Sequence, residues 1–390
     1  MQYSSLVEKV AGGSADAWDA HFAAVAAKDR GEDVILLSVG DPDFDTPQGI
    51  IDVAIQAMRA GDTHYTAMKG RDDLRACIAR QHTRCSGQTV DLNHVVITSG
   101  AQNALFVTTQ CICDSGDEVI VLQPIYVTYE ATIKAASATP VPVMLDAEQD
   151  FRLDADALKT AITTNTKAIY FVTPSNPTGM MLRQSELQAI ADLSIAYDLW
   201  VVVDEVYANI VFDHRFHHIA GLPGMAERTV TINSLSKTYA MTGWRLGWAI
   251  APVELINHIE KLVLCMLYGL PGFIQQAGLY ALEHCQDDSR NMRDIYRQRR
   301  DKLIHALATI PGLRALRPDA GMFLMVDVRQ TGLSGAEFAR RLYQSTGVSV
   351  LDATAFGTGI SGFIRISYTV ADTLLDEAIL RIRQFVDSIR

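Results

Sequence analysis

The sequence lacks any long apolar run and any excess of basic residues, and each absence excludes a class of protein. No apolar stretch in the 390 residues is long enough for a membrane-spanning helix, and residues 1–19 are too polar and acidic for a secretory or transit peptide. The formal net charge of −11 disfavours nucleic acid and anionic membrane as partners, because both require a basic face. We therefore expect a cytoplasmic protein whose partners are small molecules or a second copy of itself.

The residue spacings of a metal site are also lacking. The six cysteines form no metal-type pair, and most fall in helical or apolar patterns, which indicates reduced, structural thiols. His214, His217 and His218 cluster after an apolar strand, but no Asp, Glu or Cys completes a familiar metal-binding spacing around them. We predict no metal, and we interpret the histidine cluster as a solvated loop.

What the sequence does have is enough length and apolar content, 48% hydrophobic residues, for a large core and two domains. Apolar runs alternate with helical patterns from residue 95 to residue 251, which predicts an α/β unit. Beyond residue 311 the strands become short and alternating, as is typical of an α+β unit. We predict a large domain over residues 47–286, and a small domain with an N-terminal arm over residues 1–46 and 287–390.

The stretch from residue 234 to residue 248 carries the strongest functional signal. An apolar strand runs into Ser234, Ser236 and Lys237, so these side chains lie at a strand end, where open α/β sheets bind ligands. A lysine among small hydroxyls in an apolar stretch is expected to be buried, which lowers its pKa and makes it a nucleophile. The donor fork of Arg245 and the two hydroxyls suit a phosphate dianion. An amine beside a phosphate site indicates pyridoxal phosphate (PLP); the alternative is a surface lysine followed by a turn with a snorkelling arginine.

Other predicted strands end in residues that fit the same site. The turn over residues 99–102, between a strand and a helix, offers backbone N–H groups to an anion. Asn176 lies between two prolines, which restrict the backbone and let its side chain be aimed. Asp204 ends an apolar strand and therefore needs a cation or a donor, and an aspartate is the usual partner of the protonated PLP ring nitrogen.

Four further residues each leave two interpretations open. Tyr126 could stack on a flat ring or pack in the core. Arg365 alternates with apolar neighbours on a strand, so it requires either a substrate carboxylate or an internal salt bridge. Gly40 lies in a loop with two prolines, which is either a close approach to a ligand or a plain turn. Tyr65 is a loop tyrosine, which usually serves as a packing anchor.

Taken together and in this order, these stretches resemble the class I aminotransferases of the PLP fold-type I group over nearly the whole chain. The likeness rests on residues 40–44, 65–67, 99–102, 176–179, 204–207, 234–247 and 364–367. It implies a large domain with a mostly parallel mixed sheet between helices, a smaller α+β domain, PLP as cofactor, and a homodimer.

The resemblance also implies a role for each residue. Lys237 would form the Schiff base with PLP, Asp204 would keep the pyridine nitrogen protonated, and Tyr207 with Asn176 would hydrogen-bond the ring oxygen. The remaining cofactor contacts would be Tyr126 on the ring and, at the phosphate, Gly100, Ala101, Gln102, Ser234, Ser236, Arg245 and Tyr65 of a second subunit. Gly40, Asn176 and Arg365 would receive the substrate carboxylate.

The implied activity is a ping-pong transfer of the amino group of an L-amino acid to a 2-oxo acid such as pyruvate or 2-oxoglutarate. Rival activities on the same fold are a cysteine-S-conjugate β-lyase and an aspartate-type aminotransferase. A sensor domain of a transcription regulator would need a DNA-binding domain, and we expect the residues before Ile35 to be too few and too acidic for one.

The sequence also bears on the amino donor. The predicted helix over residues 103–113 has no cation for a second carboxylate, and Asp352-Ala353, where many relatives carry Pro-Gly, is expected to bring an acid toward the site. Both features favour a basic or neutral donor over aspartate. Residues 17–19, 264–269, 316–319 and 331–334 resemble the arginine–pyruvate aminotransferases of bacteria. We predict arginine as donor and pyruvate as acceptor, with neutral donors as the alternative.

Overall fold

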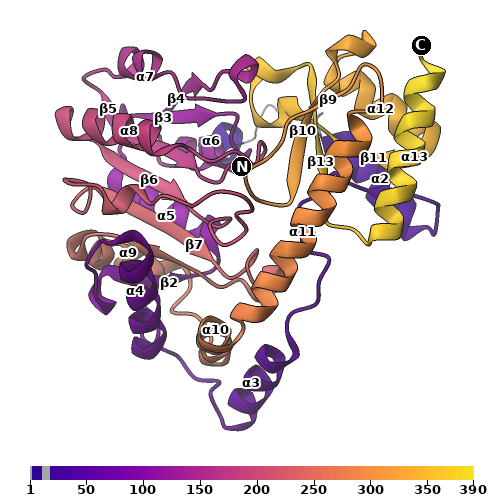
Figure 1. Ribbon diagram of the computed structural model, residues 1–390. Helices are drawn as coiled ribbons and strands as arrows, with labels where there is room; N and C mark the ends of the chain where they lie inside the picture. The colour runs from indigo at the N-terminus through magenta and orange to yellow at the C-terminus, as the bar shows by residue number, and fades with distance from the viewer. Residues whose placement is uncertain (1, 11–17) are drawn as a thin grey trace.

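The computed structural model describes residues 2–10 and 18–390 of the chain (Figure 1). These residues form sheets of seven, four and two strands together with their helices. Ala17, which belongs to one of the stretches resembling the arginine–pyruvate enzymes, lies outside the described residues. The larger sheet has seven strands in the order β2-β8-β7-β6-β5-β3-β4. Their bounds are β2 (Val95–Thr98), β3 (Glu118–Gln123), β4 (Thr139–Met144), β5 (Thr166–Val172), β6 (Trp200–Asp204), β7 (Thr229–Ser234) and β8 (Gly247–Ile250).

This large sheet is mixed and mostly parallel, which confirms the predicted fold class. Strands β4, β3, β5, β6 and β7 pair in parallel, and β8 runs antiparallel to both of its neighbours. Because the carboxyl ends of parallel strands meet at one edge, the residues that end β3, β5, β6 and β7 are brought to the same edge.

Helices cover both faces of the large sheet because side chains alternate along each strand. In β6, Val202 faces a core shared with α5 (Ala101–Ile112), α6 (Thr128–Ala135) and α9 (Val253–Met266). Val201 and Val203 face the opposite core, shared with α7 (Ala155–Ala161) and α8 (Gln184–Ala196). On that same face, α3 (Gln48–Arg59), α4 (Asp72–Ser86) and α10 (Gly272–His284) cover the β2–β8 end of the sheet.

The smaller sheet has four antiparallel strands in the order β12-β13-β10-β9. These are β9 (Arg314–Ala315), β10 (Phe323–Asp327), β12 (Leu351–Asp352) and β13 (Phe363–Ser367), accompanied by α12 (Gly335–Thr346) and α13 (Asp372–Ser388). Helix α11 (Gln286–Leu307) runs from α10, below the large sheet, to the small sheet at the upper right of Figure 1. The domain boundaries at residues 47 and 287 stay a prediction.

The N-terminal segment contains helix and a short strand, as the helical spacing of its aromatic and apolar residues and the apolar run that starts at Ile35 predict. It forms α1 (Ser5–Val10), α2 (Asp19–Asp29) and the two-residue strand β1 (Ile35–Leu36), which pairs in parallel with β11 (Val348–Ser349). In α2 the buried residues are Ala24 and Ala27, whereas Phe22 is 63% exposed, so the face expected from the aromatic spacing is wrong.

Two strands also depart from the sequence expectation. The apolar residues of 348–351 predict a single strand, but the structure divides them between two strands, because β11 pairs with β1 and β12 pairs with β13. Strand β4 was not expected, since Pro140 and Pro142 remove two backbone donors. It lies at the edge of the large sheet, where a strand needs hydrogen bonds on one side only.

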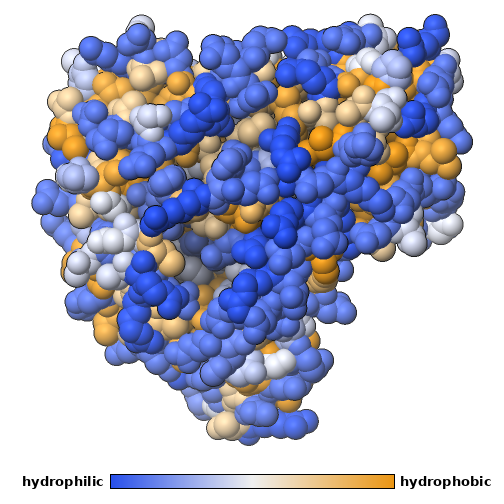
Figure 2. All heavy atoms as spheres, viewed as in Figure 1, coloured by the Kyte–Doolittle hydropathy of each residue, from blue (hydrophilic) through white to orange (hydrophobic). Residues whose placement is uncertain are grey.

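The surface drawn in Figure 2 is mainly hydrophilic, with hydrophobic residues in separate patches. Among the described residues, no helix combines the length and apolar character required to cross a bilayer. All six cysteines are free thiols, as predicted, although Cys85 and Cys265 are exposed.

Candidate active site

The predicted site residues meet in a cavity of about 530 Å³ at the carboxyl edge of the large sheet. A cavity of this size suits a small cofactor together with a small substrate. Every residue predicted to bind cofactor or substrate lines the cavity except Gly100, whose neighbour Ala101 does, and Tyr65. Trp18, Asp41 and Tyr129 also line it and were not among the predicted site residues.

Lys237 follows the end of β7 and projects into this cavity. Its Nζ donates a hydrogen bond to the backbone oxygen of Gly40 at 2.7 Å. Burial lowers the pKa of Lys237 to about 8, and the carboxylate of Asp41 opposes this shift. A substantial fraction of this amine is therefore neutral near physiological pH, as a nucleophile or a proton acceptor must be.

Asp204 ends β6 and turns its carboxylate into the same cavity. Oδ2 accepts a hydrogen bond from the Tyr129 hydroxyl at 2.7 Å, and Oδ1 accepts one from the backbone N–H of Val206 at 3.0 Å. Burial raises the pKa of Asp204 to about 6, while these two hydrogen bonds lower it. The carboxylate is held in one orientation and lacks a close cationic partner among the described residues, so it suits a protonated ring nitrogen.

Tyr129 is the residue of this group that sequence reasoning missed. It lies on α6, three positions after Tyr126, and its side chain is buried. The sequence could have indicated only that a buried tyrosine hydroxyl requires a hydrogen-bonding partner. It does not reveal that the partner is Asp204.

An anion cradle lies where β2 turns into α5. Gly100 has φ +79°, and a Cβ at this position would lie 2.4 Å from the Arg245 guanidinium. The first backbone N–H groups of α5, at Ala101 and Gln102, have no intrahelical partner. Arg245 donates to the carbonyl oxygens of Thr242 at 2.8 Å and Ser99 at 3.4 Å, and no carboxylate of the described residues lies within ion-pair distance of it. These free donors, beside the Ser234 and Ser236 hydroxyls, fit a phosphate group.

Arg365 on β13 is buried at 2% exposure and has no acidic partner among the described residues, so the expected alternative of an internal salt bridge is wrong. It donates to Asn176 Oδ1 at 2.8 Å and to the Ser38 backbone oxygen at 2.6 Å, while its Nε has no partner. The rings of Phe323 and Phe356 lie about 5 Å from the guanidinium carbon. A buried guanidinium of this kind suits a substrate carboxylate, and burial lowers its pKa to about 10.

Tyr207 completes the ring side of the cavity with Asn176 and Tyr126. Its ring packs edge-on against Phe323 at 5.4 Å between centroids. Burial raises the pKa of Tyr207 well above its ordinary value, so the hydroxyl stays protonated and can donate a hydrogen bond.

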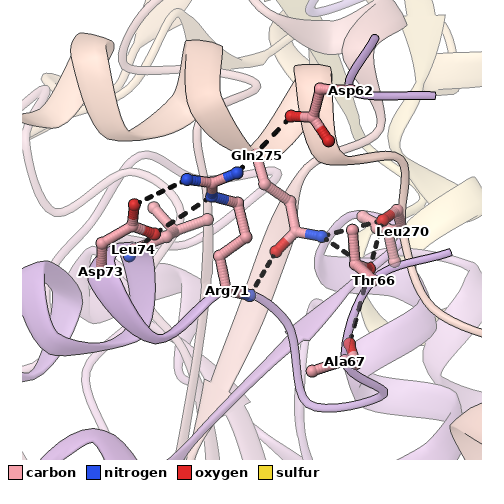
Figure 3. A network of polar contacts seen from close by, with 8 residues as sticks. All are labelled: Asp62, Thr66, Ala67, Arg71, Asp73, Leu74, Leu270 and Gln275. Atoms are coloured by element: carbon pink, nitrogen blue, oxygen red, sulfur yellow. Dashed lines mark hydrogen bonds and ion pairs between the residues drawn. The ribbon is translucent and has the colours of Figure 1, made fainter. Parts of the chain in front are cut away.

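Tyr65 does not reach the cavity of its own chain. It is 82% exposed and packs against Tyr268 with the ring centroids 4.7 Å apart. The loop that carries it is fixed from below by the buried side chain of Gln275, which donates to Thr66 Oγ1 at 3.2 Å and to the Leu270 backbone oxygen at 2.8 Å (Figure 3). The exposure of Tyr65 is therefore not the result of a loose loop.

Asp352 corrects the sequence interpretation of the donor pocket. It does not line the cavity, so the expectation that it brings an acid toward the site is wrong. Its carboxylate instead accepts hydrogen bonds from the backbone N–H and the hydroxyl of Thr354, because it caps the short turn of helix at 353–356. The acids that do line the cavity are Asp41 and Asp204.

His218 corrects the interpretation of the histidine cluster as a solvated loop. Its side chain is only 14% exposed, and its Nδ1 lies 2.8 Å from Glu205 Oε2. His214, in contrast, is 65% exposed and agrees with that interpretation.

The sequence model of the family "Aminotransferase class I and II" matches residues 32–382, and this chain belongs to that family. It is therefore an aminotransferase, as its fold and site geometry indicate. The chain is 50% identical over 382 residues to the arginine–pyruvate transaminase AruH of Pseudomonas aeruginosa, covering 98% of this chain and 97% of that protein. It is 34% identical over 358 residues to an aspartate aminotransferase of Pyrococcus horikoshii, covering 91% of each.

Solved structures agree. The aspartate aminotransferase of Thermus thermophilus with maleate matches with a TM-score of 0.92 at 32% identity, covering 99% of this chain and 100% of the other. The aromatic aminotransferase of Pyrococcus horikoshii matches with a TM-score of 0.89 at 35% identity, covering 94% and 99%. The predicted family and enzyme class are confirmed.

Proposed function

We propose that this aminotransferase takes the amino group of arginine and transfers it to pyruvate, with PLP bound in the cavity. The observation that carries the proposal is the 50% identity, over nearly the full length of both chains, to an arginine–pyruvate transaminase. The aspartate and aromatic enzymes share less of the sequence, although they share the fold.

The cavity fits PLP in three respects: an anion cradle at Gly100 and Arg245, a carboxylate at Asp204, and an amine of lowered pKa at Lys237. When bound, PLP supplies an electrophilic carbon for the substrate amine and an electron sink for the bond that breaks at the α-carbon. The protein supplies the remaining parts of the reaction.

Each side chain then has a definable task. Arg365 binds the α-carboxylate and, with Asn176, orients the α-carbon toward the lysine. Lys237, once its amine is free, would accept the α-proton of the donor at Nζ and pass it on within the same half-reaction. In the second half-reaction the transfer runs in reverse, and Nζ delivers a proton to the α-carbon of the acceptor. Asp204, as a carboxylate, would hold a proton on the ring nitrogen of the bound cofactor. The two half-reactions use the same groups, so the amine passes from donor to acceptor in ping-pong order.

The charges of the cavity are consistent with a donor other than a dicarboxylate. Its three permanent or potential cations are Lys237, Arg245 and Arg365, and each has a task at the amine, the phosphate or the α-carboxylate. No further lysine or arginine of the described residues lines the cavity to meet a second carboxylate. Asp41 and Trp18 are available instead to a cationic side chain, by charge and by the face of the indole ring.

The proposal is tested by a donor screen with pyruvate as acceptor. Because a guanidinium desolvated against a carboxylate contributes on the order of 2 kcal/mol, kcat/KM for arginine should exceed that for norleucine by roughly tenfold or more. Equal values for norleucine or aspartate would overturn the choice of donor and leave the aminotransferase assignment intact. Incubation with cysteine conjugates and no acceptor tests the β-lyase activity, which would release pyruvate and ammonia.

A homodimer with shared sites is part of the same proposal. The support is Tyr65, an exposed tyrosine next to the hydrogen-bonded Thr66, which a second subunit could place at the phosphate. Mixing Lys237→Ala chains with Tyr65→Phe chains should recover activity, since some hybrid sites would have both original residues. No recovery, with subunit exchange demonstrated, would contradict shared sites.

A further inference from the structure

A buried carboxylate lies directly behind the cavity. Glu205 follows Asp204 in the chain, is 2% exposed, and does not line the cavity. Its Oε2 lies 2.8 Å from Nδ1 of His218, and its Oε1 is buried without a hydrogen-bond partner among the described residues. A carboxylate removed from water in this way is costly unless a cation meets it.

Among the described residues, His218 is the one that lies within ion-pair distance of the Glu205 carboxylate. Burial alone would lower the pKa of His218, and Arg215 on the same loop acts in the same direction, but the Glu205 carboxylate and its hydrogen bond raise the pKa overall. The ring of Phe216 packs edge-on against His218 at 4.7 Å and helps to exclude water. His218 is therefore placed to supply the positive charge that the buried carboxylate requires.

A second histidine nearby does not compete for this charge. His82 on α4 lies 6.2 Å from His218 between ring centroids, and its Nε2 donates to Gln88 Oε1 at 2.7 Å. Burial lowers the pKa of His82, and the charge of His218 lowers it further, whereas Gln88 and Glu205 raise it. His82 is thus held as a neutral ring that packs beside the charged one.

We propose that Glu205 and His218 form a buried ion pair with two effects. The pair fixes the backbone of residues 204–207 on the side away from the cavity, and the positive charge of His218 weakens the electrostatic effect of Glu205 on Asp204. The two are positioning residues, and their effect on the reaction rests on the proposed role of Asp204. The three residues of the segment that line the cavity, Asp204, Val206 and Tyr207, are attached to the backbone that this pair anchors.

The pair couples protonation behind the cavity to the carboxylate inside it. The charge of Glu205 contributes to raising the pKa of Asp204. With His218 protonated this contribution is offset, whereas with His218 neutral it acts in full and Asp204 binds a proton more readily. Because the pKa of His218 is raised in the folded state, the stability from the pair is fully present below about pH 6.5 and is lost as pH rises through the folded value.

The test is a double-mutant cycle on the holoenzyme with Glu205→Gln, His218→Gln and the combined variant. His218→Gln leaves a buried, unpaired carboxylate, so we expect kcat at pH 7 to fall roughly tenfold and urea unfolding to shift to lower concentration. The combined variant has no buried charge and two amides that can bond each other, so it should recover to within about twofold of the original kcat. His217→Gln, the same substitution at the adjacent residue outside the pair, is the matched control and should change neither readout.

A merely structural role would not move the pH profile. As pH rises through the titration of His218, followed by NMR of labelled histidine, the ion pair that anchors the segment 204–207 is lost. The original enzyme should therefore lose kcat over this range, and the combined variant should not. A combined variant no better than His218→Gln, or a His218 titration unchanged by Glu205→Gln, would overturn the ion pair. Recovery of stability without recovery of kcat would overturn the coupling to Asp204. The donor screen tests the aminotransferase proposal separately.

Discussion

The seven-stranded sheet places an amine, a carboxylate and an anion cradle along one edge, whereas the four-stranded sheet contributes a single buried guanidinium, Arg365. The groups on the large sheet are mutually adjusted: burial and neighbouring charges move the pKa values of Lys237 and Asp204 toward neutrality. Arg365 remains a fixed cation that binds but does not exchange protons, even with its pKa lowered to about 10.

This difference separates chemistry from substrate binding. The reacting groups belong to one rigid sheet, while Arg365 lies on the other sheet and Trp18 lies at the start of α2. A relative can therefore change its substrate through the small sheet, the N-terminal segment or the loop of Asp41 and keep the large-sheet chemistry.

Removal of the amine should have the largest effect. Lys237→Ala deletes both the covalent attachment and the proton carrier, so turnover should fall by about 10⁴-fold or more. The visible absorption band of the bound cofactor should change as well, which separates this variant from a substrate-binding defect. Turnover within tenfold of the original enzyme would contradict the assignment of Lys237.

Removal of the carboxylate on the same sheet should come second. Asp204→Ala takes away the charge that stabilises the protonated ring, an effect larger in the transition state than in binding, so kcat should fall by about 10³-fold. The dissociation constant of PLP, measured by equilibrium dialysis, should rise by less than that factor. If PLP affinity alone fell, the electron-sink role of Asp204 would be wrong.

Changing the small sheet should affect substrates and leave the cofactor untouched. Arg365→Gln replaces two charge-assisted hydrogen bonds with neutral ones, so kcat/KM should fall by about 10²-fold. The reduction should appear mainly in KM, for the donor and for the acceptor alike, with PLP affinity unchanged. A loss of PLP binding in this variant would break the proposed division between the two sheets.

The smallest effect should come from Tyr129. Tyr129→Phe removes the hydroxyl that donates to Asp204 Oδ2. Because this hydrogen bond lowers the pKa of Asp204, its loss should raise that pKa further, and kcat should fall about fivefold. The loss should be greatest at low pH, where Asp204 is protonated first. Tyr126→Phe is a suitable comparison, because its hydroxyl has no bond to Asp204 in the structure.

Much of the large sheet could be predicted because its strands are short, apolar and separated by helical patterns. Strand β6 and its terminal Asp204, and β7 with Lys237 three residues beyond it, are local features of the chain. Strand β4 could not be recognised because it contains two prolines. The division of residues 348–351 into two strands depends on their pairing partners. Val348 pairs with Ile35, more than 300 residues away in the sequence, and Leu351 pairs with Arg365, about 14 residues away.

The hydrogen-bond partners of side chains were harder to predict from the sequence than the helices and strands. Asp352 was expected near the donor because its loop lies near the site, but an aspartate that can cap its own turn satisfies its carboxylate locally. Tyr129 and Glu205 have no local partner, and theirs come from segments 75 and 13 residues away.

The sequence by itself determined most of the strands and helices, the polar residues at strand ends and, through their combination, the aminotransferase family. These follow from local periodicity and from residues that must lie at the carboxyl edge of a parallel sheet. Only the tertiary structure decided which buried charges meet which partners: Arg365 with no acid, Asp204 with Tyr129, and Glu205 with His218. The reason is that the free energy of a buried charge depends on atoms within a few ångströms of it in space, whatever their distance along the chain.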